Sequence, residues 1–557
     1  MSSRLPGSLA QISTNPLLTA GITSVRKPVV FGVGDTKVLI ENERVIRSTT
    51  AGGADTLTNT IYGATDADKL ASIVRVGNSP NSADYTKTSN YVITDGTVEW
   101  SPGNDVTYPS SGYDEPAAGQ EYYITYYKSI ANFAITEYTS EGDIKSAHGN
   151  VIFAKYSQYT TVTAVSTGAP TTTFNWGVTG DSIDAPVTDW SVTFYSGPNT
   201  GVTRTVSTYS NGQFVTSISF PNSISVGDVV LISHASPKVN MLTSGALLAL
   251  RNGSQSVLVG QFTNTSWSDK IVPTSSQYST ALAAHLETLK SNVEFPYYLV
   301  PMLPDNTTTF AANSDAQTSA INPTWDHCKL MSAPENKGER ACIAGFLAAT
   351  TADSFKSYGA TYFSQRMVII APGDLGFSDV STRTLNGSIG AAAWAGRWCS
   401  RTDYRSMLRE SLTGVIVKAN FYNAVQQRDL TAKGISFLSS DAGIVRVIAS
   451  KTTDTSTADT EDVAVVAIAD HVKKTVREDL DATFIGQPIS QRLVGAIGGK
   501  MSSIFERLII DQVIETYRAD SITVRQSLTE PRLIEVTASI KPLYSLWWLD
   551  ISMSFFV

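Results

Sequence analysis

Residues that could carry out chemistry are few in this chain and lie far apart. The histidines and cysteines are His148, His234, His285, His327 and His471, with Cys328, Cys342 and Cys399. No two histidines have a metal-ligand spacing such as HExxH, and the cysteines form no CxxC pair. His327 and Cys328 are adjacent, so in a helix their side chains would point about 100° apart. We interpret these isolated residues as structural.

Motifs for phosphate binding and nucleophilic catalysis are absent from the sequence. It contains no GxGxxG, no GxxxxGK[ST] and no GxSxG. The stretch "DSIDAPVTDW" carries Asp181, Asp184 and Asp189, which we interpret as turn residues of a β-rich region, with a calcium site as the alternative. The 9 tryptophans and 23 tyrosines are spread through expected strands, which favours cross-strand packing over carbohydrate binding. We therefore expect no catalytic residue, no metal and no cofactor.

The composition limits the partners of this protein. Charged residues make up 17 % of the 557 residues, below the typical value of about 25 %, and the net charge is −8. No basic run indicates a nucleic-acid surface, so we expect no direct nucleic-acid binding. A polar but weakly charged surface suits a protein that packs against copies of itself. An ordinary β-rich globular protein is the alternative.

Targeting signals are also absent. The start, "MSSRLPGSLAQIS", lacks a basic segment followed by a long apolar one, so we expect no signal peptide. No apolar run approaches the roughly 18–20 residues of a membrane span, so we expect no membrane insertion. The scattered cysteines suit a reducing compartment. Together these features favour synthesis in the cytoplasm.

The expected elements change character along the chain. Residues 1–34, with three prolines among short apolar pieces, predict an extended arm that ends in the strand "PVVFGVG". Residues 35–137 and 150–236 predict short strands and turns, including hairpins at an Asp-Gly pair and at Asn211-Gly212, and a short helix near 66–72. Residues 237–455 alternate strands with helices, one of them at roughly 387–399, which predicts an α/β layer. Residues 451–462 indicate a linker or exposed loop.

The last hundred residues predict two helices and two strands. Val465, Ile468, Val472, Val476 and Leu480 share one helix face, and a second helix carries Leu493, Ile497, Ile504, Phe505 and Leu508. The segment "RLIEVTASIKP" predicts a strand in which Ile534, Val536, Ala538 and Ile540 alternate inward. A final strand, "SLWWLDISMSFFV", alternates apolar residues at Trp547, Leu549, Ile551, Met553, Phe555 and Val557.

Several stretches, taken in order, resemble the tail sheath proteins of contractile-tailed bacteriophages. "NERVIRSTTAGGADTL" and "GYDEPAAGQEYYITYY" are similar to the β-domain near the start of many sheaths. "EYTSEGDIKSAHGN", "GALLALRNGSQSVLVGQF", "RMVIIAPG", "AAAWAGRWC" and "LTAKGISFLSSDAGIVRVIASKTTD" resemble core segments, and "FIGQPIS" with "IEVTASIKPLYSLWWLDISMSF" resembles the C-terminal domain. The order and spacing of these matches carry the resemblance, which covers most of the chain. Residues 150–236 match nothing in the family, and the arm lacks the "PGVYV"-like opening of many sheaths.

The resemblance implies an α+β multidomain fold. It has a β-rich N-terminal domain at 35–137, an inserted outer β-domain at 150–236 and an α/β sheath core at 138–149 and 237–455. A C-terminal domain at 456–557 combines helices with terminal strands. In the family, subunits form hexameric rings stacked around a tail tube, and terminal arms add strands to neighbours. The six alternating residues from Trp547 to Val557 would then be exchanged between subunits, because an isolated apolar edge strand invites aggregation.

The implied function is structural, not enzymatic: a subunit of the virion tail, assembled in the host cytoplasm, that contracts to drive the tube through the host envelope. Expected partners are the protein itself, the tube protein, and baseplate and tail terminator proteins. Lys473, Lys474 and Arg477 are candidates for tube contact, with a solvated helix face as the alternative. Two other interpretations remain: a tail fibre or adhesin with carbohydrate-binding β-domains, and a cytoplasmic α/β enzyme with β-insertions.

Overall fold

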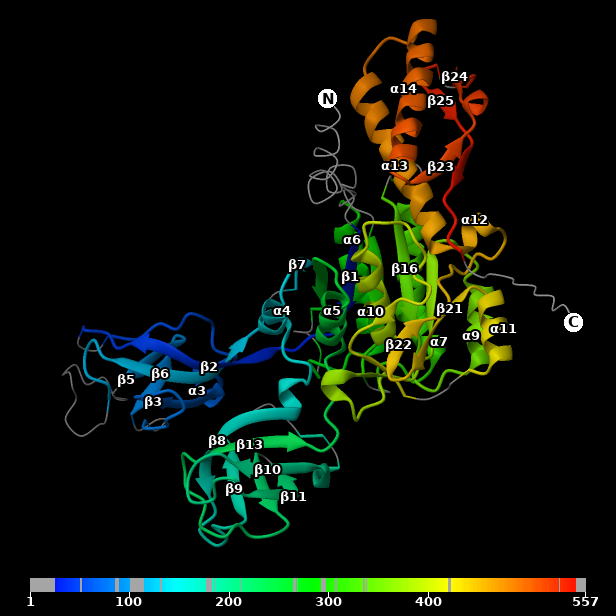
Figure 1. Cartoon of the computed structure of the whole chain (residues 1–557). Coiled ribbons are helices and arrows are strands. Elements are labelled where there is room, and N and C mark those ends of the chain that lie inside the picture. Colours follow the sequence, from blue (N-terminus) through cyan, green and yellow to red (C-terminus); the bar gives the residue numbers. More distant parts are fainter. Residues whose placement is uncertain are drawn as a thin grey trace, which may run out of the picture.

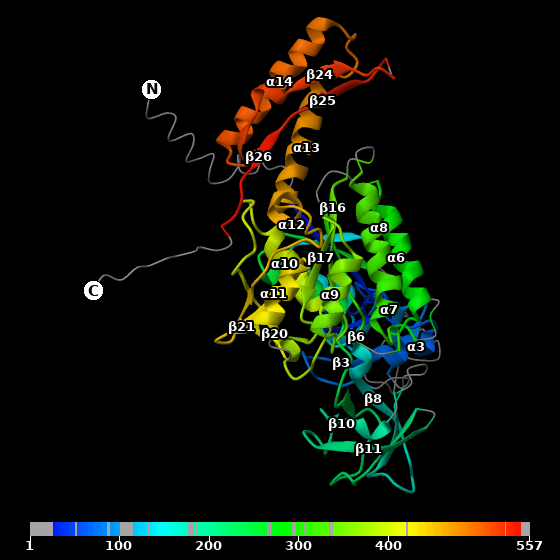
Figure 2. The same cartoon turned by 90° about the vertical axis from the view of Figure 1, so that its right-hand side faces the viewer.

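The computed structural model describes residues 26–546, apart from short gaps in the chain. The gaps are residues 51–52, 86–89, 101–114, 131–132, 177–182, 185, 211, 264–266, 268, 292–296, 306–307, 334–335, 337, 419–421 and 530. The chain forms four parts: a core sheet with its helices, two outer β-domains and a C-terminal helical unit (Figure 1). The C-terminal unit and one outer β-domain extend from opposite ends of the core (Figures 1 and 2).

A nine-stranded sheet forms the centre of the core. Its strands lie in the order β19 (Ser411–Leu412), β22 (Ile444–Val447), β21 (Ile435–Asp441), β17 (Met367–Ala371), β16 (Arg340–Gly345), β15 (Tyr297–Pro301), β1 (Lys27–Gly32), β14 (Val257–Gln261) and β7 (Thr136–Tyr138). The strands from β21 to β14 run parallel. Strand–helix alternation therefore predicted the α/β layer correctly.

Helices cover both faces of this sheet. One face packs against α5 (Met241–Arg251) and α10 (Ser388–Cys399). The other packs against α6 (Ser275–Leu289), α7 (Asn313–Ala316), α8 (Asn322–Met331), α9 (Ala352–Thr361) and α11 (Ala424–Ala432). In β1, Val30 packs on the face covered by α5 and α10, and Val29 and Phe31 pack on the opposite face. The strand is therefore buried on both sides, as is usual for parallel sheets. The strand that the sequence predicted at the end of the arm 1–34 is confirmed at Lys27–Gly32, and its place is central in the core sheet.

The first outer β-domain, here called the N-terminal β-domain, spans residues 37–129. Its sheet has the order β2 (Lys37–Ile46), β6 (Glu121–Ser129) and β3 (Ile73–Gly77), beside the hairpin β4 (Tyr91–Thr94) and β5 (Thr97–Trp100). The predicted Asp-Gly turn joins this hairpin, since Asp95 and Gly96 both have positive φ. The helix α3 (Asp66–Ser72) lies where the sequence predicts one.

The second outer domain is a closed barrel of residues 157–234. Its strands are β8 (Ser157–Val165), β9 (Thr173–Trp176), β10 (Trp190–Phe194), β11 (Thr203–Ser210), β12 (Gln213–Thr216) and β13 (Val229–His234), and β13 closes the barrel between β8 and β10. The predicted hairpin is confirmed, because Ser210 pairs with Gln213. Two short links join the barrel to the core: the turn η1 (Ala154–Tyr156) after α4 (Glu141–His148), and residues 235–240 before α5.

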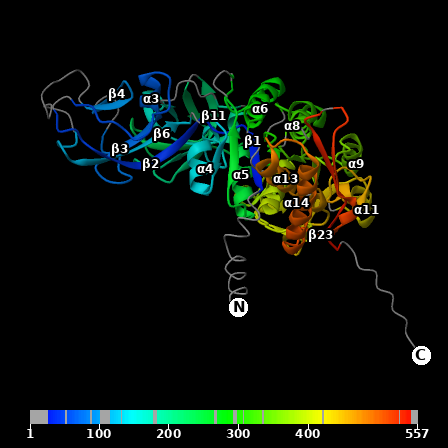
Figure 3. The same cartoon turned by 90° about the horizontal axis from the view of Figure 1, so that it is seen from above.

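The C-terminal unit spans residues 458–546 and stands on the core (Figures 1 and 3). It contains α12 (Ala458–Glu461), α13 (Val463–Phe484), α14 (Gln491–Ile510) and four short strands, β23 (Ile514–Tyr517), β24 (Thr523–Gln526), β25 (Ile534–Thr537) and β26 (Ile540–Pro542). The linker or exposed loop that the sequence predicted for 451–462 is exposed only in part: residues 456–459 are exposed, and residues 451–453 are not. Thr452 and Thr453 are buried, because their side chains hydrogen bond to backbone carbonyls of neighbouring segments.

Candidate assembly interface

The three cysteines and four of the histidines are buried, and His234 is half-buried. His148 shares a hydrogen bond of 2.7 Å with Gln261, and His285 one of 2.8 Å with the Gln261 carbonyl. Burial lowers the pKa of His148 to about 4. Burial also raises the pKa of all three thiols. Among the described residues no group of three or more His, Cys, Asp or Glu could hold a metal ion.

The two long helices of the C-terminal unit pack by their apolar faces. Asp462 caps α13 by accepting from Ala464 N, and Ser490 caps α14 by accepting from Leu493 N. The predicted face of α14 is confirmed. Its buried residues are Leu493, Ile497, Met501, Ile504, Phe505 and Leu508. On α13, Ile468 and Val472 are buried beside them, while Val476 and Leu480 are partly buried. The helix pair forms a small core of its own.

A two-stranded ribbon lies along this helix pair. Strand β23 pairs with β26, and β24 with β25, so the four strands make one long antiparallel hairpin. Its apolar residues, Val524, Ile534, Val536 and Ile540 among them, pack against the helices but are only partly buried. Within the described part of the chain no third strand joins the ribbon, so both of its outer edges present backbone donors and acceptors.

Large apolar side chains are exposed around the ribbon. Leu528 in its turn is 97 % exposed, and Leu546, which follows β26, is 77 % exposed. Ile485 and Ile510, at the ends of the two helices, are each 78 % exposed. A two-stranded ribbon is marginally stable by itself. Unpaired edges combined with exposed apolar residues are typical of a surface that another strand completes.

Ion pairs fasten α13 to the core sheet. Arg366, which precedes β17, donates two hydrogen bonds to Asp470, one of them 2.7 Å long, and both side chains are nearly buried. About two turns further along α13, Arg477 pairs with Glu339 at 3.0 Å. Asp470 therefore fixes the helix where it leaves the core.

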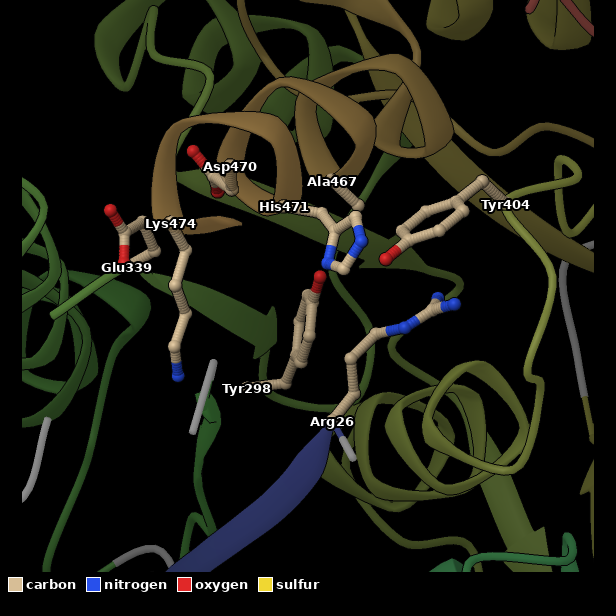
Figure 4. A pocket seen from close by; sticks show the side chains of 8 residues that line it. All are labelled: Arg26, Tyr298, Glu339, Tyr404, Ala467, Asp470, His471 and Lys474. Atoms are coloured by element: carbon tan, nitrogen blue, oxygen red, sulfur yellow. The ribbon is translucent and has the colours of Figure 1, made fainter. Parts of the chain in front are cut away.

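Arg26 fills the space between α13 and the core (Figure 4). Its guanidinium lies 4.3 Å from the ring centre of Trp398 and 4.8 Å from that of Tyr404. The Tyr404 ring also meets His471, 5.5 Å away, and burial together with Arg26 and Lys474 lowers the pKa of that histidine to about 4. The cavity left between these side chains measures about 20 Å³, room for about one water molecule.

The two ends of the described chain meet the same loop, residues 401–410. Arg26 donates a hydrogen bond of 2.6 Å to the carbonyl of Asp403. Ser545 accepts one of 2.8 Å from the backbone of Ser406. The segments before residue 26 and after residue 546 therefore both depart beside the base of α13.

The predicted site residues are placed as follows. The alternating residues Trp547, Leu549, Ile551, Met553, Phe555 and Val557 lie outside the described residues. Lys473 is exposed on α13. Lys474 lines the cavity below the helix and lies 3.7 Å from Glu478, and Arg477 turns toward Glu339.

Sequence reasoning did not identify Arg26, Tyr404 or Asp470 as parts of this junction. Arg26 is 377 residues from Asp403 in the chain, so no local pattern links the two. The available signal is weak: an arginine directly before a continuous apolar strand, and an aspartate on the apolar side of a long helix.

Comparisons with known proteins identify structural neighbours only. No family model matches the chain, and no curated protein matches it. The contracted helical sheath of the anti-feeding prophage matches with 14 % identity over 56 % of this chain and 81 % of that chain, with a TM-score of 0.41. A sheath tail protein from Listeria innocua matches with 12 % identity over 74 % and 89 %, with a TM-score of 0.40. One from Desulfitobacterium hafniense matches with 11 % identity over 69 % and 82 %, with a TM-score of 0.36. All three are sheath proteins, the kind of protein that the sequence resembles. Because these identities and TM-scores are low, we argue the function from the residues of this chain.

Proposed function

We propose that this protein is the subunit of a bacteriophage contractile tail sheath. Copies would form hexameric rings stacked around the tail tube, and contraction would drive the tube through the host envelope. One observation carries the proposal: a ribbon with two open edges, β23–β26, is followed directly by a segment of alternating apolar residues. The ordered resemblance of most of the chain to sheath proteins supports the same conclusion.

Strand exchange would link the copies. An open edge accepts a strand through backbone hydrogen bonds, and the apolar residues of that strand would cover the partly buried face of the ribbon. Both arms depart beside the base of α13, so both can reach neighbours from one point. Contacts between unlike surfaces do not close on themselves and can propagate into a long polymer.

The mechanism would be mechanical. Subunits would assemble in an extended lattice of higher free energy and slide into a more tightly packed one, while the exchanged strands keep them connected. Interfaces with two stable packings would store the energy, so no nucleotide is required. Baseplate and tail terminator proteins would meet the two ends of the polymer, and the assembly would form in the host cytoplasm as part of the virion tail.

Tube contact is proposed at Lys473, the exposed member of the three basic residues on α13. Lys474 and Arg477 are directed toward Glu478 and Glu339 and fit this role less well. Lys473→Glu should weaken tube-dependent assembly and leave the unfolding temperature of the subunit unchanged. Equal assembly of the variant and the parent on purified tubes would remove this contact from the proposal.

Negative-stain electron microscopy of the purified full-length protein tests the proposed function. Striated hollow tubes, formed at high protein concentration or on added tubes, are the expected result. Slender trimers would point to a fibre, and small uniform particles under every condition would contradict the proposal.

A further inference from the structure

The turn η1 lies where the core, the N-terminal β-domain and the barrel meet. It follows α4, which ends beside the core, and it leads directly into β8 of the barrel (Figure 1). The returning link runs alongside it: Asn240 N donates to Val151 O at 2.7 Å, and Ile152 forms a bridge with Val239. The barrel is thus attached through one narrow pair of chain segments, here called the neck.

Asp35 of the core forms a hydrogen bond with the first residue of η1. It is 2 % exposed and follows the central strand β1. Its carboxylate accepts from Ala154 N at 2.6 Å and from Thr36 N at 2.8 Å, while its own backbone donates to His148 O at 3.0 Å. Gly149 is required next to it, because a Cβ there would lie 2.3 Å from the Asp35 Cβ and φ is +87°.

Asp184 holds the other side of the same turn. It comes from the barrel loop before β10 and accepts from the Tyr156 hydroxyl and from Lys155 Nζ, the latter at 2.9 Å. Lys238 of the returning link lies 3.4 Å from the same carboxylate. Burial raises the pKa of Asp184, but the Tyr156 hydroxyl and Lys155 outweigh it and keep the pKa below its usual value. Asp184 is therefore charged at neutral pH and bonded to both segments of the neck.

Two carboxylates of the core, Asp269 and Asp305, also contact the neck. Lys155 Nζ also lies 3.6 Å from Asp269, so this lysine joins the barrel loop to the core. Asp305 of the core accepts from Val239 N at 3.0 Å and pairs with Arg383 at 2.7 Å. A cavity of about 10 Å³ lies beneath Lys238 and Asp305, so the packing here leaves a small void.

The barrel also contacts the N-terminal β-domain, where Lys37 Nζ donates to Gln158 Oε1 at 2.8 Å. Val229 of the barrel packs with Val74 and Tyr127 of the N-terminal β-domain, and Tyr159 N donates to the Tyr127 hydroxyl at 2.9 Å. These contacts join the barrel to the other outer domain and not to the core. The ion pairs of the neck link the barrel loop to the core.

We propose that Asp184 is a lock that fixes the orientation of the barrel on the core through Lys155 and Lys238, and that removing its charge lets the barrel swing as a folded body. The device belongs to the single subunit, so it does not depend on the proposed sheath function. A barrel held by a lock of this kind can take a second orientation when neighbouring copies supply new contacts.

Distances between spin labels in the full-length protein test the lock. Labels at Ile218→Cys on the barrel and Ala432→Cys on the core use two exposed positions, and the three native cysteines are buried. The variant Asp184→Asn keeps the side-chain volume and removes the charge. Its distance distribution should broaden or shift relative to the parent. Asp189→Asn is the matched control, because Asp189 lies in the same loop and takes part in no ion pair among the described residues.

A second variant separates a lock from a folding contact. Lys155→Met keeps the aliphatic stem and removes both ion pairs without touching Asp184 itself. It should broaden the distribution in the same direction, while near-ultraviolet circular dichroism of both variants stays that of a folded barrel. An unchanged distribution in both variants would overturn the proposal. So would loss of the barrel's signal, which would make Asp184 a contact needed for folding.

Discussion

Three buried or nearly buried charged residues of this chain lie where its parts meet. Asp35 joins the core to the barrel neck, and Arg366 with Asp470 joins the core to α13. Burying a charge is unfavourable unless other groups compensate it, so the loss of one partner should lower the stability of the protein measurably. They also give the sharpest single-residue tests.

Asp35 should make stability depend on pH. Burial raises its pKa to about 6, from an unfolded value of 3.8. A raised carboxyl pKa means that the contribution to stability is fully present below the unfolded pKa and is lost as pH rises through the folded one. Between pH of about 4 and about 7 the parent should lose about 2 kcal/mol of unfolding free energy relative to Asp35→Asn. Urea unfolding of both proteins across this range measures the difference. A constant difference would show that Asp35 does not titrate there.

Arg26 should stabilise the junction below α13 through its two aromatic contacts. Because the guanidinium is buried against Trp398 and Tyr404, Arg26→Ala should lower the unfolding free energy by about 2 kcal/mol. Arg405→Ala is the control: this side chain is 81 % exposed and pairs with Asp403 at 3.2 Å, so its loss should cost less than about 1 kcal/mol. Chemical denaturation followed by tryptophan fluorescence compares the two. Equal losses would remove the special role of Arg26.

Among the elements, α13 connects the C-terminal unit to the core. Asp470→Ala leaves Arg366 buried without its carboxylate, which should cost about 3 kcal/mol. On the same helix, Asp479 pairs with Arg507, whose side chain is 51 % exposed, so Asp479→Ala should cost less than about 1 kcal/mol. Thermal unfolding of the two variants gives the comparison. A loss for Asp470→Ala no larger than for Asp479→Ala would mean that the pair does not fasten the helix.

The elements also show which parts of the fold can be predicted from sequence. Helix α10 at Ser388–Cys399 and the buried face of α14 can be predicted from the local spacing of apolar residues. The two hairpins can be predicted from their Asp-Gly and Asn-Gly pairs. Barrel closure could not be predicted, since it depends on β13 pairing with β8 and β10 across long separations. The central place of β1 was missed for the same reason: its neighbours β14 and β15 come more than two hundred residues later.

The exchanged strand stays a prediction, because the alternating residues after 546 lie outside the described residues. The junction of Arg26, Tyr404 and Asp470 could not be predicted, because each contact joins residues distant in sequence and none has a periodic pattern.

For the whole molecule, the barrel is expected to be dispensable for assembly. It lies at the end of the core opposite the C-terminal unit (Figures 1 and 2), and Ile152 and Val239 of the neck are bridged. Replacing residues 153–238 by a short Gly/Ser link should leave a folded subunit that still polymerises, although Val74 and Tyr127 become exposed. Electron microscopy and a melting curve of the deletion check this. A folded deletion that no longer assembles would place the barrel in the subunit contacts.

The proposed function depends most on where the final segment is buried. Six large apolar side chains on one strand face contribute on the order of ten kcal/mol gross, at roughly 1.5–3 kcal/mol each, before the cost of ordering. If a neighbour's ribbon provides the burial, a subunit lacking residues 547–557 keeps its own core of α13, α14 and β23–β26. If the subunit's own C-terminal unit provides it, that core loses the same energy.

Thermal melting and electron microscopy of one sample lacking residues 547–557 distinguish these outcomes most directly. We expect the truncated subunit to melt within a few degrees of the parent and to form no tubes under conditions in which the parent does. A C-terminal unit that melts far below the parent, or a truncated subunit that assembles normally, would contradict strand exchange by this segment.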